Sequence, residues 1–226
     1  MDLISLWEAT LVLLRELHCL IGCFVVLCLL LKRRLYILVL DGLRIRSNLR
    51  YEVMKIILLD VMSLDSKLTR WKEKNIYKWS SHEDYQHFCR AREENNLLVM
   101  GSGTFNAVRP MPEKERLRIV MTTQPEKYKK FMVNGQLEFT NEKPKELVKR
   151  LVGLGYEQML LVGGKRIATA FLKEHLINEL WLTIEPRIFG QGEALVSMER
   201  MDVSLELFHF ERLNKKGTIL LKYKVL

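Results

Sequence analysis

The chain has 226 residues, of which 48% are hydrophobic and 28% are charged. This balance excludes a disordered chain, a collagen-like chain and a disulfide-stapled miniprotein. A total of 36 Lys and Arg against 27 Asp and Glu gives a net charge of +9, which permits nucleic acid, anionic lipid or phosphorylated small molecules as partners without choosing among them.

Residues 1–53 are more apolar than the rest of the chain. The run from Leu17 to Leu31 is followed at once by Lys32, Arg33 and Arg34, whereas a cleaved secretory signal carries its positive charges before the apolar run. Three interpretations stay open: a membrane anchor that leaves the remainder cytoplasmic, an amphipathic extra helix, or upstream sequence translated from a start placed before Met54. We therefore expect an apolar helical extension over 1–53 and a globular domain over 54–226.

The globular part alternates predicted strands and helices. Short apolar runs predict buried strands at 55–62, 97–100, 117–121, 158–162 and 180–184. Apolar faces at helical spacing predict helices that begin after Ser81, over 144–154 and over 165–176. Two alternating segments, 203–210 and 218–226, flank a hairpin turn at 214–217. The expected fold is an α/β domain with a mostly parallel central sheet, helices on both faces and a C-terminal antiparallel hairpin.

The first helix of the globular part has a clear start signal. Ser81 is placed to act as its N-cap, and Asp84 three positions later can complete a capping box. Tyr85, Phe88 and Cys89 then follow at the spacing of one apolar face.

Small and hydroxyl residues gather where three predicted strands end. These ends are Gly101–Thr104, Thr122–Thr123 and Gly163–Gly164. In open α/β sheets ligands bind beyond the carboxyl ends of the strands, and the free amides of a helix start attract phosphate. The sequence therefore predicts a site for a pyrophosphate at this edge, the alternative being tight helix entries without a ligand. Neither GxGxxG nor a P-loop motif occurs.

The order of these segments resembles the dihydrofolate-reductase-like superfamily, and most closely the reductase domain of the bacterial bifunctional riboflavin-biosynthesis deaminase-reductase and its stand-alone relatives. The resemblance covers residues 54–226. It is carried by Met62–Asp65, Trp79–Ser81 with Glu83 and Asp84, Met100–Gly101 with Thr104 and Phe105, Val162–Gly164, Phe171–Leu172, Asn178–Leu180, Leu182–Ile184 with Pro186, and Phe189–Gly192.

The resemblance implies an NADPH-dependent reductase that transfers a hydride to a small heterocyclic or ribosylamino substrate, as 5-amino-6-(5-phosphoribosylamino)uracil reductase does; pterin reduction of the dihydrofolate reductase type is the alternative. It places Asp65 on the substrate side as the catalytic residue. The residues implied for the cofactor are Gly101, Ser102, Gly103, Thr104, Gly163 and Gly164 at the pyrophosphate, Thr122 and Thr123 near the 2′-phosphate, and Lys165 and Arg166 at the following helix start.

Three positions depart from the family pattern. Ser66 stands where glycine is usual, Ser102 where a cation is frequent, and Val162 where an acid commonly precedes the paired glycines. The usual substrate-phosphate signature is also missing, and no zinc deaminase motif occurs. These departures keep open a nucleotide-binding module without turnover.

Partners and location are predicted from composition and pattern. No metal site is expected, because only His82 and His87 are near each other in sequence, and their spacing of five puts them on different faces of a helix. No nucleic-acid partner is expected. Cys19, Cys23, Cys28 and Cys89 form no CxxC motif, which favours a reducing, cytoplasmic compartment. Membrane contact is expected only through residues 1–53, and the unbroken terminal strands predict a homodimer.

Overall fold

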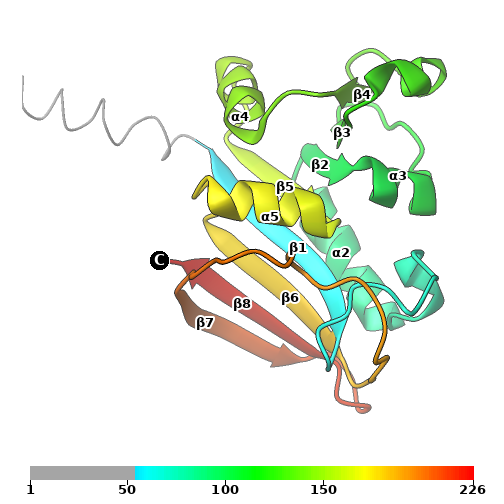
Figure 1. Ribbon diagram of the computed structural model, residues 1–226, viewed down its shortest axis with the longest axis vertical. Coiled ribbons are helices and arrows are strands. Elements are labelled where there is room, and N and C mark those ends of the chain that lie inside the picture. Colours follow the sequence, from blue (N-terminus) through cyan, green and yellow to red (C-terminus); the bar gives the residue numbers. More distant parts are fainter. Residues whose placement is uncertain (1–53) are drawn as a thin grey trace, which may run out of the picture. The chain divides into compact units, whose positions relative to one another are not determined.

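The computed structural model describes residues 54–226 (Figure 1). The predictions for residues 1–53, an apolar helical extension, a membrane anchor or an early start, lie outside the described residues. None of the helices within 54–226 has the length and apolar character that a bilayer crossing needs.

The strands are β1 (Lys55–Ser63), β2 (Leu97–Gly101), β3 (Leu117–Met121), β4 (Leu137–Thr140), β5 (Gln158–Val162), β6 (Glu179–Glu185), β7 (Leu205–Arg212) and β8 (Ile219–Val225). The α-helices are α2 (His82–Glu93), α3 (Ser102–Val108), α4 (Pro144–Gly153) and α5 (Lys165–Lys173), with short 3-10 helices at Ile76–Lys78 and Pro125–Phe131.

The described strands form one sheet in the order β4-β3-β2-β5-β1-β6-β8-β7. The strands from β4 to β6 are mutually parallel, whereas β8 runs antiparallel to both β6 and β7. The predicted mostly parallel sheet with a C-terminal antiparallel hairpin is thus confirmed. Strand β4 was not predicted, because its four residues are too few to display a clear alternation.

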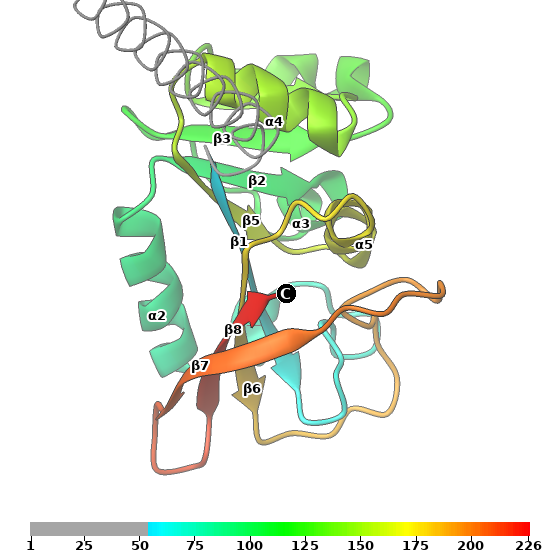
Figure 2. The ribbon, with the colours of Figure 1, turned by 90° about the vertical axis from the view of Figure 1, so that its left-hand side faces the viewer.

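Apolar side chains cover both faces of the sheet and divide the core into two clusters. Ile56 and Leu58 of β1 belong to the cluster that includes Leu147 of α4 and Phe171 of α5. Ile57 and Leu59, which point to the opposite face of β1, belong to the cluster that includes Ala91 of α2. Because side chains alternate along a strand, an apolar run such as that of β1 must be covered on both sides. Figure 2 shows α2 on one side of the sheet and α4 and α5 on the other.

Helix α2 begins at the predicted N-cap but lacks the predicted capping box. The Ser81 hydroxyl accepts a hydrogen bond from the Asp84 amide at 3.2 Å. The Ser81 amide, however, donates to Oε1 of Glu185 at 2.6 Å rather than to Asp84. The Asp84 carboxylate instead accepts from the hydroxyls of Thr183 and Ser80. Glu185, which is distant in sequence, therefore accepts the hydrogen bond that a capping box would assign to Asp84.

Strand β7 forms one edge of the sheet. It pairs only with β8 among the described strands, and all eight of its residues are exposed. The predicted turn joins the two strands: Oδ1 of Asn214 accepts from the amides of Gly217 and Thr218 at 3.1 and 3.2 Å, and Gly217 adopts φ +100°, which glycine reaches without strain.

Candidate active site

The three glycine- and threonine-containing strand ends meet at one edge of the sheet. Met100 of β2 is in register with Val162 of β5, and Gly101 is in register with Met121 of β3. Leu59 of β1 also pairs with Val162. The residues that follow these positions are, in the order of the strands across the sheet, Thr122 after β3, Ser102 after β2, Gly163 after β5 and Asp60 within β1. The three strand ends named in the sequence analysis are therefore neighbours at one edge of the sheet.

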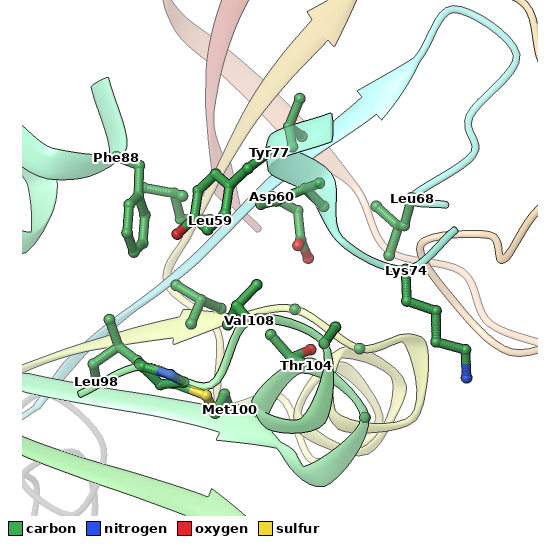
Figure 3. Close-up of a pocket in the computed structure, with 18 of the residues that line it drawn as sticks. Leu59, Asp60, Leu68, Lys74, Tyr77, Phe88, Leu98, Met100, Thr104 and Val108 are labelled. Carbon is green, nitrogen blue, oxygen red and sulfur yellow. The ribbon is translucent and has the colours of Figure 1, made fainter. Parts of the chain in front are cut away.

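A cavity of about 170 Å³ lies beside residues 59–61 in the middle of β1, Leu98 and Met100 of β2, and the Val162–Gly164 end of β5 (Figure 3). Its apolar lining includes Leu68, Phe88 and Met100, and its polar lining includes Asp60 and Thr104. An engineered cavity of about 150 Å³ binds benzene, so this space suits a single six-membered ring. A larger ligand would place the rest of its atoms outside the cavity.

Only part of the predicted cofactor set lines this cavity. Gly103, Thr104, Gly163 and Gly164 do so. Gly101 lies directly beside them, because a Cβ built on it would be 4.0 Å from the carbonyl oxygen of Gly163. The other predicted residues follow the same strand ends outside the cavity lining: Ser102, Thr122, Thr123, Lys165 and Arg166.

The backbone around the cavity has features that let a ligand come close to it. Gly163 adopts φ +68° and Gly164 φ +95°, values that favour glycine. Gly101 and Gly164 precede α3 and α5, and neither helix has a side-chain hydrogen bond at its N-cap. The first amides of α5 are therefore available to an anionic group.

Two buried acids near the cavity were not assigned to the site by the sequence analysis. Burial raises the pKa of Asp60 to about 8, with a smaller contribution from the charge of Asp84. Burial likewise raises the pKa of Asp84 to about 6, although hydrogen bonds from Thr183 and Ser80 oppose that shift. The available signal was a single acid inside the apolar run of β1. Within residues 54–226 no group of three or more His, Cys, Asp or Glu side chains could hold a metal ion.

Comparison with known proteins identifies the family. A family model described as the RibD C-terminal domain matches residues 54–219. The chain belongs to this family. No curated protein matches its sequence significantly.

Several solved structures share the fold of this RibD C-terminal domain. Acinetobacter baumannii RibD superposes with a TM-score of 0.64 at 16% identity, over 77% of this chain and 58% of that chain. The riboflavin biosynthesis reductase Rib7 of Saccharomyces cerevisiae gives 0.58 at 16% identity, over 77% and 90%. A dihydrofolate reductase from Enterococcus faecalis, solved with NADP(H), gives 0.55 at 17% identity, over 76% and 96%. The fold is therefore dihydrofolate-reductase-like, as the sequence resemblance implied.

In this RibD C-terminal domain Asp65 ties two loops together and is absent from the cavity lining. Its Oδ1 accepts from the Ser63 hydroxyl at 2.6 Å and from the Phe189 amide at 3.0 Å, and its Oδ2 accepts from the Gly190 amide at 2.8 Å. These hydrogen bonds, that from Ser63 first, lower the pKa of Asp65 to about 2. The carboxylate is ionised at neutral pH and holds no proton to donate.

The same two loops are joined along their length. The Leu68 amide donates to the Glu193 carbonyl at 2.7 Å, and the Glu193 amide donates to the Thr69 hydroxyl at 2.9 Å. At Gly192 a Cβ would lie 2.1 Å from the Thr69 carbonyl oxygen. Leu68, Thr69 and Glu193 also line the cavity, so this joined segment forms one of its walls.

Ser66 adopts φ +63°, the left-handed conformation that glycine tolerates and other residues adopt at a cost of about 1–2 kcal/mol. We predict that Ser66→Gly raises the free energy of unfolding by about 1 kcal/mol and Tm by about 3 °C, measured by thermal denaturation. Ser81→Gly is the control, because Ser81 has φ −76° and only its N-cap hydrogen bond would be lost. A Tm unchanged or lowered in Ser66→Gly would contradict the assigned strain.

Proposed function

We propose that the chain is an NADPH-dependent reductase that delivers a hydride to a small heterocyclic or ribosylamino substrate, such as 5-amino-6-(5-phosphoribosylamino)uracil. The observation that carries the proposal is the ring-sized cavity, which is lined on one side by Gly103, Thr104, Gly163 and Gly164 and on the other by apolar side chains. Membership of the RibD C-terminal domain family supports it. A nicotinamide supplies the hydride, and the protein has to position its ring and exclude water.

The residues at the strand ends fit the phosphates of such a coenzyme. The uncapped amides at the start of α5 would bind the pyrophosphate together with Gly101–Thr104, where β2 ends and α3 begins. Lys165 and Arg166 in the first turn of α5 would supply the positive charge that Ser102 does not. The pyrophosphate would thus lie between β2 and β5.

The end of β3 fits the additional phosphate that distinguishes NADPH from NADH. Thr122 and Thr123 precede the 3-10 helix Pro125–Phe131. Its lysines, Lys127, Lys129 and Lys130, are exposed. An adenosine 2′-phosphate at this edge would meet hydroxyl and ammonium donors, which supports NADPH over NADH.

Asp65 remains the residue proposed for the substrate side, with a positioning role. Its carboxylate holds the 187–193 loop against the 64–69 loop, and the two loops together carry Leu68, Thr69 and Glu193 of the cavity wall. Asp65 would therefore shape the substrate space without transferring a proton.

Titration calorimetry of the full chain with NADPH and with NADH tests the proposal. We expect NADPH to bind more tightly, and we expect its absorbance to fall on adding 5-amino-6-(5-phosphoribosylamino)uracil. Oxidation only with dihydrofolate would favour pterin reduction. Binding without oxidation by either compound would favour the non-catalytic module, and no binding of either coenzyme would refute the proposal.

We also propose a homodimer formed through the β7 edge. Leu207, Phe208 and Phe210 are 48%, 43% and 72% exposed. An unpaired edge strand that carries large apolar side chains invites pairing with another chain, and a second copy supplies the same edge under twofold symmetry.

We predict that Phe210→Lys converts a dimer to a monomer in sedimentation-velocity experiments, because the new charge would be buried at the proposed interface. Leu154→Lys, at the exposed end of α4 (62% exposed), is the matched control and should stay dimeric. A wild-type chain that sediments as a monomer at micromolar concentration would rule out the β7 interface.

A further inference from the structure

We propose that the Asp60 carboxyl donates a proton to the substrate in this cavity, at the atom next to the carbon that receives the hydride. This inference rests on the proposed reductase function, and it assigns the proton-transfer step of that reaction to a residue of β1.

The Asp60 carboxyl lies in the cavity beside the glycines that the proposed coenzyme would contact. Asp60 lies in β1 beside the β5 end, with Oδ1 3.6 Å from the Cβ position of Gly163. Figure 3 shows the carboxyl pointing into the cavity between Leu68 and Thr104. A ring held by Thr104 and Gly163 would therefore lie next to it.

The Asp60 carboxyl has an unused hydrogen-bonding atom. Its Oδ2 is enclosed and has no hydrogen-bond partner among residues 54–226. Leaving a buried polar atom unpaired costs about 1–3 kcal/mol. A ligand atom that pairs with Oδ2 would recover this free energy on binding.

The surrounding charges favour the protonated form of Asp60. The cations that line the cavity are each paired with a glutamate: Lys74 with Glu193 at 3.8 Å, and Arg92 and Arg118 with Glu113 at 3.3 and 2.6 Å. No cation appears among the causes of the raised pKa of Asp60, whereas the Asp84 carboxylate adds to it. The remaining titratable groups of the lining, Tyr77 and Tyr85, are neutral near pH 7, because the pKa of each is raised above its usual value.

Asp84 does not compete for this role. Its carboxylate accepts hydrogen bonds from Thr183 and Ser80, and its pKa of about 6 leaves it mostly ionised at pH 7. Asp60, with a pKa of about 8, stays mostly protonated at the same pH. Two neighbouring acids with separated pKa values commonly divide the acid and base roles of a site.

The step balances with the reductant that the proposed function supplies. The hydride forms a C–H bond as the π bond of the substrate C=O or C=N group breaks, and the electron pair moves to the oxygen or nitrogen. That atom takes the proton from Asp60, whose O–H bond breaks. The substrate gains two electrons, the nicotinamide loses two, and the Asp60 carboxylate regains its proton from solvent.

The Asp60→Asn variant of the full chain tests the proposal, because asparagine keeps the shape of the side chain and cannot give up a proton. With NADPH and 5-amino-6-(5-phosphoribosylamino)uracil, we expect kcat to fall about a hundredfold or more, while the NADPH Kd from calorimetry changes less than about twofold. Wild-type kcat should decline above pH 8, the pKa of Asp60 being about 8, and the variant should lose this decline.

Infrared spectroscopy supplies a readout that needs no turnover. At pH 7 the wild-type chain should show the carbonyl stretch of a protonated carboxyl; Asp60→Asn should lose it, and Asp84→Asn should keep it. Absence of this band in the wild type would overturn the proposal. This test does not depend on whether Asp60→Asn folds.

The kinetic outcomes separate the two proposals. NADPH oxidation with an unchanged rate and pH profile in Asp60→Asn would overturn the role of Asp60 and leave the reductase function intact. Failure of the wild type to bind NADPH, or binding without oxidation by the uracil substrate or dihydrofolate, would overturn both.

Discussion

Gly163→Ala is expected to lower both stability and coenzyme affinity. The new Cβ would lie 2.9 Å from Oγ1 of Thr104, in a backbone with φ +68°. Left-handed backbone costs a residue other than glycine about 1–2 kcal/mol, and overpacking adds about 1–3 kcal/mol. We therefore expect a loss of about 2–5 kcal/mol in the free energy of unfolding and a fall of roughly 6–15 °C in Tm.

Two other glycines serve as controls. A Cβ at Gly103 or at Gly153 would meet no atom within 4 Å, but only Gly103 lines the cavity. Both glycines lie in helices, where alanine is favoured over glycine by up to about 1 kcal/mol, so neither variant should lower Tm. Gly103→Ala should bind NADPH more weakly, whereas Gly153→Ala should bind it as the wild type does. Thermal denaturation and calorimetry check each variant. Full NADPH affinity in Gly103→Ala would remove that residue from the proposed coenzyme site.

The second large effect concerns pH and the buried acid of β1. The pKa of Asp60 rises from 3.8 in the unfolded reference to about 8 in the folded chain. Between these values the folded chain holds one more proton than the unfolded chain, so raising the pH favours unfolding by about 1.4 kcal/mol per pH unit. Asp60→Asn removes this contribution. Between pH 6 and pH 8 the variant should therefore gain about 2 kcal/mol relative to the wild type.

Urea denaturation at several pH values measures this difference. Asp202→Asn is the matched control, since Asp202 is exposed, and it should follow the wild-type pH dependence. Parallel curves for the wild type and Asp60→Asn would show that Asp60 ionises in the folded chain much as it does in the unfolded chain, against the assigned burial effect.

The fold could be predicted from the sequence largely because the local signals agreed. The apolar runs of β1, β2, β3 and β5, the Ser81 cap and the Asn214–Gly217 turn each specify structure over a few residues, and each is present in the structure. What escaped prediction depends on distant partners. The Ser81 amide donates to Glu185, which is 104 residues away in sequence. A motif that covers only the start of one helix cannot predict such a partner.

The candidate site was only partly predictable for the same reason. Glycine and threonine at strand ends are visible in the sequence, so the sequence analysis could name four residues that line the cavity: Gly103, Thr104, Gly163 and Gly164. Asp60 was hidden inside an apolar strand, because burial, which determines its protonation, exists only in the folded chain. The pattern around Asp65 indicated only its own loop, because the amides of Phe189 and Gly190 that donate to its carboxylate lie 124 and 125 residues away in sequence.

The joined loops have a consequence for the dynamics of the cavity wall. The 64–69 and 187–193 segments share hydrogen bonds at Asp65, Leu68 and Thr69, so neither can detach while the other keeps its place. Local unfolding events involve such cooperative units as a whole. Amide hydrogens of both segments should therefore exchange with solvent in the same local unfolding event. The frequency of that event determines how often the cavity loses this wall.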